Sequence, residues 1–342
     1  MKLTKICLYV FLILGIPTIL YLGAGLLTPL AIALVLAMML NPVVNKLNKW
    51  GVSEGLSIGI SVMGVVSIGL ILLLAIITQA SAFADDWTSI QEQLQIQWEN
   101  AQGYVVQWTG MSTEAVNKRM TIDSNKIFGA LTERATGVAG SFVGTLGSLV
   151  LILVYLVFLL IERFRFKKFI LKITHDGKED TARSAMDDML DIAQGYLVGK
   201  LVLIGILATV YSIGFMIIGL KYGIFLAILA AILSVIPYLG NMVGGSLAIV
   251  AAVVTQGGTG MVIGVLVTMG VAQFLESYVV EPFLVGAKVN LNPFFTIFGV
   301  IAFGTLWGVV GTILAVPLVA IAKVIFDHLE RFKPLGYVMG DE

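Results

Sequence analysis

Residues 258–282 read GTGMVIGVLVTMGVAQFLESYVVEP, an apolar run that carries one carboxylate well inside it, Glu276. A helix needs about 20 apolar residues to cross a bilayer, so this run predicts a transmembrane helix. A charge in hydrocarbon costs roughly 3 kcal/mol on insertion scales, and chains seldom place one there without a role. Glu276 is therefore the first candidate for a functional residue.

The composition of the whole chain is that of an integral membrane protein. Of the 342 residues, 58% are hydrophobic and 12% are charged, and the mean hydropathy is +0.98. A soluble domain has about twice that charged fraction. The net charge of zero argues against nucleic-acid binding, which needs a basic face. One cysteine and two histidines cannot form a disulfide framework or a Cys/His metal site, so we expect no metal and no cofactor.

The alternation of apolar and polar runs predicts an all-α integral membrane protein. We expect about 5–8 transmembrane helices, short broken or re-entrant helix hairpins, and a small helical extracytoplasmic domain. The predicted parts are N-terminal transmembrane helices (1–79), an extracytoplasmic amphipathic helical domain (80–135), a transmembrane helix (136–162), a cytoplasmic juxtamembrane helical segment (163–195), a C-terminal transport core with broken or re-entrant helices (196–327) and a cytoplasmic tail (328–342).

The first apolar residues form two short runs, 6–22 and 26–40. Gly23-Ala24-Gly25 between them and Asn41-Pro42 after them are turn signals, so we expect a hairpin. The first run leads directly into the second, which favours an uncleaved span over a signal peptide.

The predicted extracytoplasmic domain carries an aromatic and aliphatic stripe with helical spacing. One interpretation packs this stripe on a second helix around residues 115–131. The other makes it a subunit contact, and for this reason we expect a homo-oligomer. The stripe consists of Trp87, Ile90, Leu94, Trp98, Ala101, Val105 and Trp108.

Residues 163–183 form the densest basic run, with seven lysines and arginines. The positive-inside rule places this run in the cytoplasm. Four crossings before it would put the N-terminus inside too, and counting onward puts the C-terminus on the same side. Asp187, Asp188 and Asp191 follow on a predicted helix that enters the next span, 196–220, and we interpret them as a solvated acidic face.

Short apolar pairs dominate the chain after residue 222. Residues 222–236 and 242–254 are separated by PYLGN at 237–241, and residues 294–306 and 309–326 by a glycine-rich turn at 304–308. Unwound backbone at membrane depth is tolerated only where it is buried or lines a cavity. We therefore predict a substrate-binding site at the first break, with a loop at the membrane edge as the alternative. Its candidate residues are Pro237, Tyr238, Gly240 and Asn241.

Glu276 is the candidate for proton or ion coupling. A low-dielectric site disfavours the charged form of a carboxylate, so such a group can load and release a proton. Gln273 lies one α-helical turn away and could hydrogen-bond it. Lys200, near the start of the 196–220 span, is the third residue of this predicted site. The alternative is a Lys200–Glu276 ion pair that only holds two helices together.

Several motifs in the last hundred residues resemble the autoinducer-2 exporter family of bacterial membrane proteins, the PerM-type permeases. The resemblance implies a many-span transporter of the bacterial inner membrane, in a family whose members are linked to export of the quorum-sensing signal or to sodium/proton exchange. The motifs are IPYLG at 236–240, Leu275-Glu276, Glu281-Pro282, Gly286, Asn292-Pro293, GTLWG at 304–308 and LAVPL at 314–318.

These observations predict a transporter and not an enzyme. Gly199-Lys200-Leu201 lacks the loop and the hydroxyl of an ATP-binding P-loop. We expect a secondary transporter that exports a small polar metabolite or signal, such as autoinducer-2, across the inner membrane with proton coupling. The alternatives are a sodium (or lithium)/proton antiporter and a passive channel or envelope scaffold. The expected partners are a small-molecule or ion substrate and the bilayer.

Overall fold

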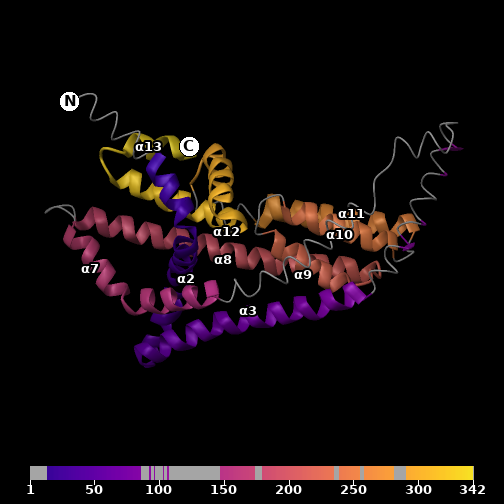
Figure 1. The fold of residues 1–342 in the computed structure, drawn as a ribbon, viewed down its shortest axis with the longest axis horizontal. Coiled ribbons are helices and arrows are strands. Elements are labelled where there is room, and N and C mark those ends of the chain that lie inside the picture. The colour runs from indigo at the N-terminus through magenta and orange to yellow at the C-terminus, as the bar shows by residue number, and fades with distance from the viewer. Residues whose placement is uncertain are drawn as a thin grey trace. The chain divides into compact units, whose positions relative to one another are not determined.

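The computed structural model describes residues 14–85, 92–93, 96, 103, 106–107, 147–173, 179–234, 239–254, 258–280 and 290–341. In these residues every regular element is a helix (Figure 1). Five helices are long and apolar enough to cross a membrane, and a bent pair raises the number to six. This confirms the predicted all-α membrane fold. The tryptophan stripe of the predicted extracytoplasmic domain lies outside the described residues.

The N-terminal hairpin prediction is wrong. Residues 14–22 are helical, and α2 (Ala24–Lys49) follows without a reversal. Helical hydrogen bonds continue across the turn signal, because the Gly23 N–H donates to the Ile19 carbonyl at 2.8 Å and the Leu27 N–H to the Gly23 carbonyl at 2.9 Å. The helix also runs through Asn41-Pro42 and ends only before Gly51, which has φ +88°. The count of four crossings before the basic run therefore loses its support.

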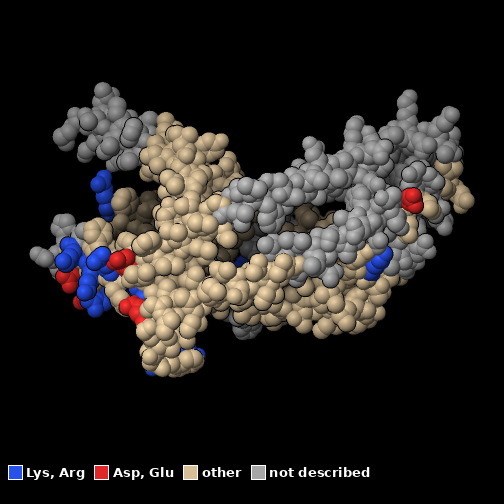
Figure 2. All heavy atoms as spheres, turned by 60° about the horizontal axis from the view of Figure 1, so that its bottom comes forward, with Lys and Arg blue, Asp and Glu red and all other residues tan. Residues whose placement is uncertain are grey.

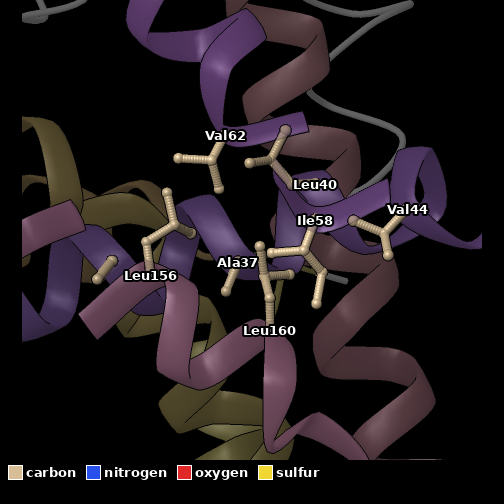
Figure 3. Packing of buried hydrophobic residues seen from close by; sticks show 8 residues of the cluster. Ala37, Leu40, Val44, Ile58, Val62, Leu156 and Leu160 are labelled. Carbon is tan, nitrogen blue, oxygen red and sulfur yellow. The ribbon is translucent and has the colours of Figure 1, made fainter. Parts of the chain in front are cut away.

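The core of the N-terminal part joins three helices: α2, α3 (Glu54–Asp85) and the helix Gly147–Ile161. Figure 3 shows side chains from all three meeting in this cluster. Because lipid is as apolar as these side chains, close packing and not the hydrophobic effect holds such helices together. Small buried residues permit the close approach, and Ser57 is one that is completely buried. The large members of the cluster include Leu40, Ile58, Val62, Leu156 and Leu160.

Two helices carry the basic run and the acidic cluster. The helix Gly147–Ile161 bends by 65° into α7 (Arg163–Ile173), which holds most of the basic residues. The next helix, α8 (Glu179–Ile217), is one 39-residue element that includes the acidic cluster and the following apolar span, as predicted. It ends at Ile217, and the φ of +69° at Gly219 allows the Leu220 N–H to reach back to the Phe215 carbonyl at 2.9 Å.

The short helices after α8 are confirmed as α9 (Gly223–Leu233) and α10 (Leu239–Val254), which pack against each other. A Cβ atom at Gly244 of α10 would overlap Ala230 of α9, so the two backbones are in direct contact there. At Gly245 an added Cβ would meet only the flexible end of Met269 in the next helix, α11 (Gly258–Phe274), which could move aside. Gly244 thus sets how closely α9 and α10 approach.

The last long element, α12 (Pro293–His328), is the predicted folded pair. Gly308 breaks it with φ 63° and ψ −142°. Side chains at Gly299 and Gly304 in the first arm would overlap Val319 and Thr312 in the second, so the arms lie antiparallel and in contact. The short helix α13 (Lys333–Met339) follows and packs on α12.

Contacts between residues divide the chain into two compact units. The first unit consists of Met1–Gly69, Ser148–Gly205 and Phe274–Glu342, and the second of Leu70–Gly147 and Ile206–Gln273. In the first unit the second arm of α12 packs on α2 and α8 through buried residues of all three helices. The predicted domain boundaries remain predictions.

Candidate functional site

Glu276 lies in a π-helical turn, Leu275–Val280, that directly follows α11. The span Thr259–Val280 that contains it is 22 residues long and apolar enough to cross a membrane. The π turn was not predicted from the sequence. Single π turns inside α-helices occur frequently at functional sites, because the wider turn displaces side chains from their α-helical positions. The one carboxylate of this span therefore lies on a local irregularity of the helix.

The π turn has one side turned outward and one turned inward. Phe274 and Tyr278 pair with ring centroids 5.2 Å apart, and Tyr278 is 72% exposed. Val280 at the end of the turn is buried. Glu276 and Ser277 are half-buried, between these two extremes. A half-buried carboxylate is accessible enough to exchange a proton or bind a solute without a rearrangement of its helix.

Lys200 and Gln273 lie in different parts of the fold. Lys200 is half-buried near the middle of α8 and belongs to the first unit, as Glu276 does. Gln273 is exposed in the last turn of α11 and belongs to the second unit. Each of the three residues makes at least one noncovalent interaction. The Lys200–Glu276 ion pair and the grouping with Gln273 remain predictions.

The structure describes only part of the predicted substrate-binding break. The first helix ends at Leu233, and the buried Ser234 caps it by donating from Oγ to the Ala231 carbonyl at 2.7 Å. Gly240 and Asn241 have helical backbone in the first turn of α10 and are not part of an unwound segment. Pro237 and Tyr238 lie outside the described residues. Two of the four predicted residues, Gly240 and Asn241, thus lie in the first turn of α10.

The profile of the AI-2E family transporter matches residues 6–331 of this chain. The chain belongs to the AI-2E transporter family. It is therefore a multi-pass membrane protein of a transporter family, which is not an enzyme class, and the resemblance found in its motifs is confirmed.

Three relatives of this AI-2E transporter show how far the similarity extends. YrrI of Bacillus subtilis (strain 168) is 30% identical over 180 residues, which are 52% of this chain and 50% of that protein. YueF of the same organism is 25% identical over 322 residues, 89% of this chain and 84% of that protein. The AI-2 transport protein TqsA of Escherichia coli (strain K12) is 24% identical over 324 residues, 93% of this chain and 90% of that protein. The chain thus spans about half of YrrI but most of YueF and TqsA.

One residue of the AI-2E motif GTLWG has a partner that the sequence did not reveal. Trp307, next to the Gly308 break of α12, donates its indole N–H to the Leu20 carbonyl at 3.0 Å. The glycines flanking this tryptophan predicted the fold of the hairpin. The acceptor could not be predicted, because it is a backbone oxygen 287 residues away. In this AI-2E transporter, the closed end of the α12 hairpin is thus hydrogen-bonded to the helix of residues 14–22.

Proposed function

We propose that this chain is a secondary transporter that exports a small polar solute of the autoinducer-2 type in exchange for protons. Membership of the AI-2E family and the similarity to the AI-2 transport protein TqsA support the substrate class. The half-buried Glu276 in the π turn of a membrane span is the observation that carries the coupling. The transporter would lie in the bacterial inner membrane, with both termini in the cytoplasm.

The coupling follows from what a carboxyl group can accept and donate. Ionised Glu276 is an acceptor on both oxygens and can bind the hydroxyl groups of a polar solute. Protonation removes the charge and turns one oxygen into a donor, so the affinity for the same solute falls. A proton and the solute therefore compete for one group. Inward movement of the proton then drives outward movement of the solute.

The same carboxylate supports sodium (or lithium)/proton exchange as a second candidate function. A hard monovalent cation binds carboxylate oxygen and competes with a proton in the same way. This candidate differs from the first in what evokes proton movement, so one assay separates them. A passive channel or scaffold predicts no coupled proton movement at all.

The test uses the purified chain in proteoliposomes that enclose a pH-sensitive dye. Addition of autoinducer-2 should evoke proton movement, and Glu276→Gln should abolish it at an unchanged level of inserted protein. Glu281→Gln, five residues further along the chain, serves as the matched control and should retain flux. Proton movement evoked only by sodium or lithium selects the antiporter. Unchanged flux in Glu276→Gln rejects the coupling role of this residue.

A double-mutant cycle with Lys200 distinguishes coupling from a purely structural ion pair. If Lys200 only neutralises Glu276, then Glu276→Gln and Lys200→Met will each lower the Tm, and the double variant will recover part of the loss. If Glu276 couples protons, flux is lost in Glu276→Gln and in the double variant alike, whatever the Tm. Measuring both Tm and flux in the same three variants thus separates an effect on stability from an effect on transport.

A further inference from the structure

The helix α7 has a surface that suits the polar face of a membrane. It follows the apolar helix Gly147–Ile161 at an angle of 65°. A helix that leaves a bilayer and bends so strongly continues closer to the membrane plane than to the membrane normal. Figure 1 shows α7 directed away from the helix before it. The sequence of α7, RFRFKKFILKI, contains five cationic residues and no acidic residue.

One side of α7 is fixed to the protein. The guanidinium Nη1 of Arg163 lies 2.9 Å from the Glu54 carboxylate at the start of α3 and donates to the Leu160 carbonyl at 2.7 Å. One turn later, Lys167 lies 3.5 Å from Asp187 of α8. These contacts fix the rotation of α7 about its axis, so its other two sides have defined directions.

The second side is apolar and exposed. Phe166, Phe169 and Ile170 are spaced by three and four residues and therefore share one face. They are 50%, 59% and 39% exposed, so the described protein leaves a large part of each one uncovered. These three large apolar side chains lie together at the end of a membrane span. In that position they can insert between the acyl chains just below the headgroups.

The third side is basic and exposed. Arg165, Lys168 and Lys172 share it with helical spacing, and all three are exposed. The nearest acidic partner is Glu162, 3.1 Å from Arg165, and it leaves that arginine 82% exposed. Figure 2 shows basic side chains gathered where α7 and the start of α8 lie, with the acidic side chains of α8 beside them. An apolar side next to a basic side is the arrangement of a helix that lies in a membrane interface.

We propose that α7 is a binding site for anionic phospholipid headgroups, with its phenylalanines in the acyl-chain boundary. Each lysine or arginine near an anionic surface contributes about 1 kcal/mol, so three should raise the local preference for anionic lipid by about a hundredfold before screening. The occupant is the bilayer that surrounds the protein. An acidic protein surface would match the basic side but would not require phenylalanines beside it.

The test places a polarity-sensitive fluorophore on the apolar side of α7 in the full-length chain. Cys7 is the one native cysteine, so Phe169→Cys in a Cys7→Ser background gives a single labelling site. The chain is inserted into phosphatidylcholine nanodiscs, and phosphatidylglycerol with a nitroxide on its headgroup is added in increasing fractions. We expect quenching at a low fraction of the anionic lipid.

Matched variants separate headgroup binding from simple insertion. Arg165→Gln with Lys168→Gln and Lys172→Gln should raise the fraction needed for half-maximal quenching at least tenfold. Lys49→Gln with Arg331→Gln and Lys333→Gln removes the same charge elsewhere and should leave it unchanged. Equal quenching by nitroxide-labelled phosphatidylcholine would overturn the preference for anionic lipid. A fluorophore that remains in water in every lipid mixture would overturn the membrane contact itself and favour a protein partner.

Discussion

Trp307 illustrates how a single side chain fixes the end of a long hairpin. Its indole donates to the Leu20 carbonyl, and its ring packs against Phe303 with centroids 5.5 Å apart. Trp307→Phe keeps an aromatic ring but removes the donor. We expect a loss of about 1 kcal/mol in the free energy of unfolding, the net worth of a typical hydrogen bond.

A thermal melt of the detergent-solubilised protein checks this expectation as a lower Tm for Trp307→Phe. Trp50→Phe is the matched control, because Trp50 is 70% exposed and its replacement should leave the Tm unchanged. Equal melting of both variants and the native chain would mean that the indole hydrogen bond contributes nothing.

The sequence identified Glu276 but not the form of its helix. The free-energy cost of a charged side chain in hydrocarbon singles out Glu276 from the sequence alone. The structure places this residue in the predicted span. The expected face shared with Gln273 assumed 3.6 residues per turn, whereas residues 275–280 form a π turn. Hydrophobic periodicity does not distinguish one wide turn in a run that is apolar on all sides, so this feature could not be predicted.

Among the elements, the bend before α7 carries a cation whose side chain is mostly buried. The side chain of Arg163 is only 13% exposed and pairs with Glu54 at 2.9 Å, while its Nε has no hydrogen-bond partner. Glu54→Gln leaves that cation without its counter-charge, and we expect a lower Tm. Glu162→Gln removes a similar pair to the 82% exposed Arg165, and exposed pairs are worth about 0–1 kcal/mol. A Tm lowered equally by both replacements would contradict the role of burial.

The break of α12 depends on Gly308. Its φ of 63° and ψ of −142° lie in a region that residues with a Cβ seldom adopt. Gly308→Ala should therefore cost about 1–3 kcal/mol, although open space surrounds the position. Gly270→Ala, in the interior of α11 and also without neighbours, should be neutral or stabilising because alanine favours the helix. Chemical denaturation of the two variants, compared with the native chain, measures both effects.

Turn signals predicted the second half of the chain better than the first. Gly308 ends a helical arm, as expected, and the break expected at 237–241 begins after residue 233. Asn41-Pro42 carries an equally strong signal, yet α2 continues through it. Leu40 and Val44 on either side of Pro42 are buried in the core formed with α3. Packing of the neighbouring turns thus overrides the local preference of proline, and a single sequence contains no measure of that packing.

At the scale of the whole molecule, the sidedness of the membrane remains a prediction that labelling can check. The basic run predicts that residue 168 is cytoplasmic, and the span that ends at residue 161 places residue 110 on the opposite side. In a Cys7→Ser background and intact cells, a membrane-impermeant thiol reagent should label Gly110→Cys but not Lys168→Cys. Labelling of both, or of Lys168→Cys alone, would contradict the predicted orientation.

A third cysteine resolves the N-terminal side. The continuous helical run of residues 14–49 replaces the predicted hairpin, so the position of the N-terminus no longer follows from counting. Lys2→Cys should be protected from the same reagent if the N-terminus is cytoplasmic. Labelling of Lys2→Cys would instead indicate a single crossing by the first helical run.

The hydrogen bond between Trp307 and Leu20 also orders the biosynthesis of the protein. Residue 20 leaves the ribosome early, and its partner is made 287 residues later. The first helix therefore lacks this hydrogen bond until almost the whole chain has been translated. A chain that stops before residue 307 can never complete this contact, so the hairpin end closes only after synthesis has passed that residue.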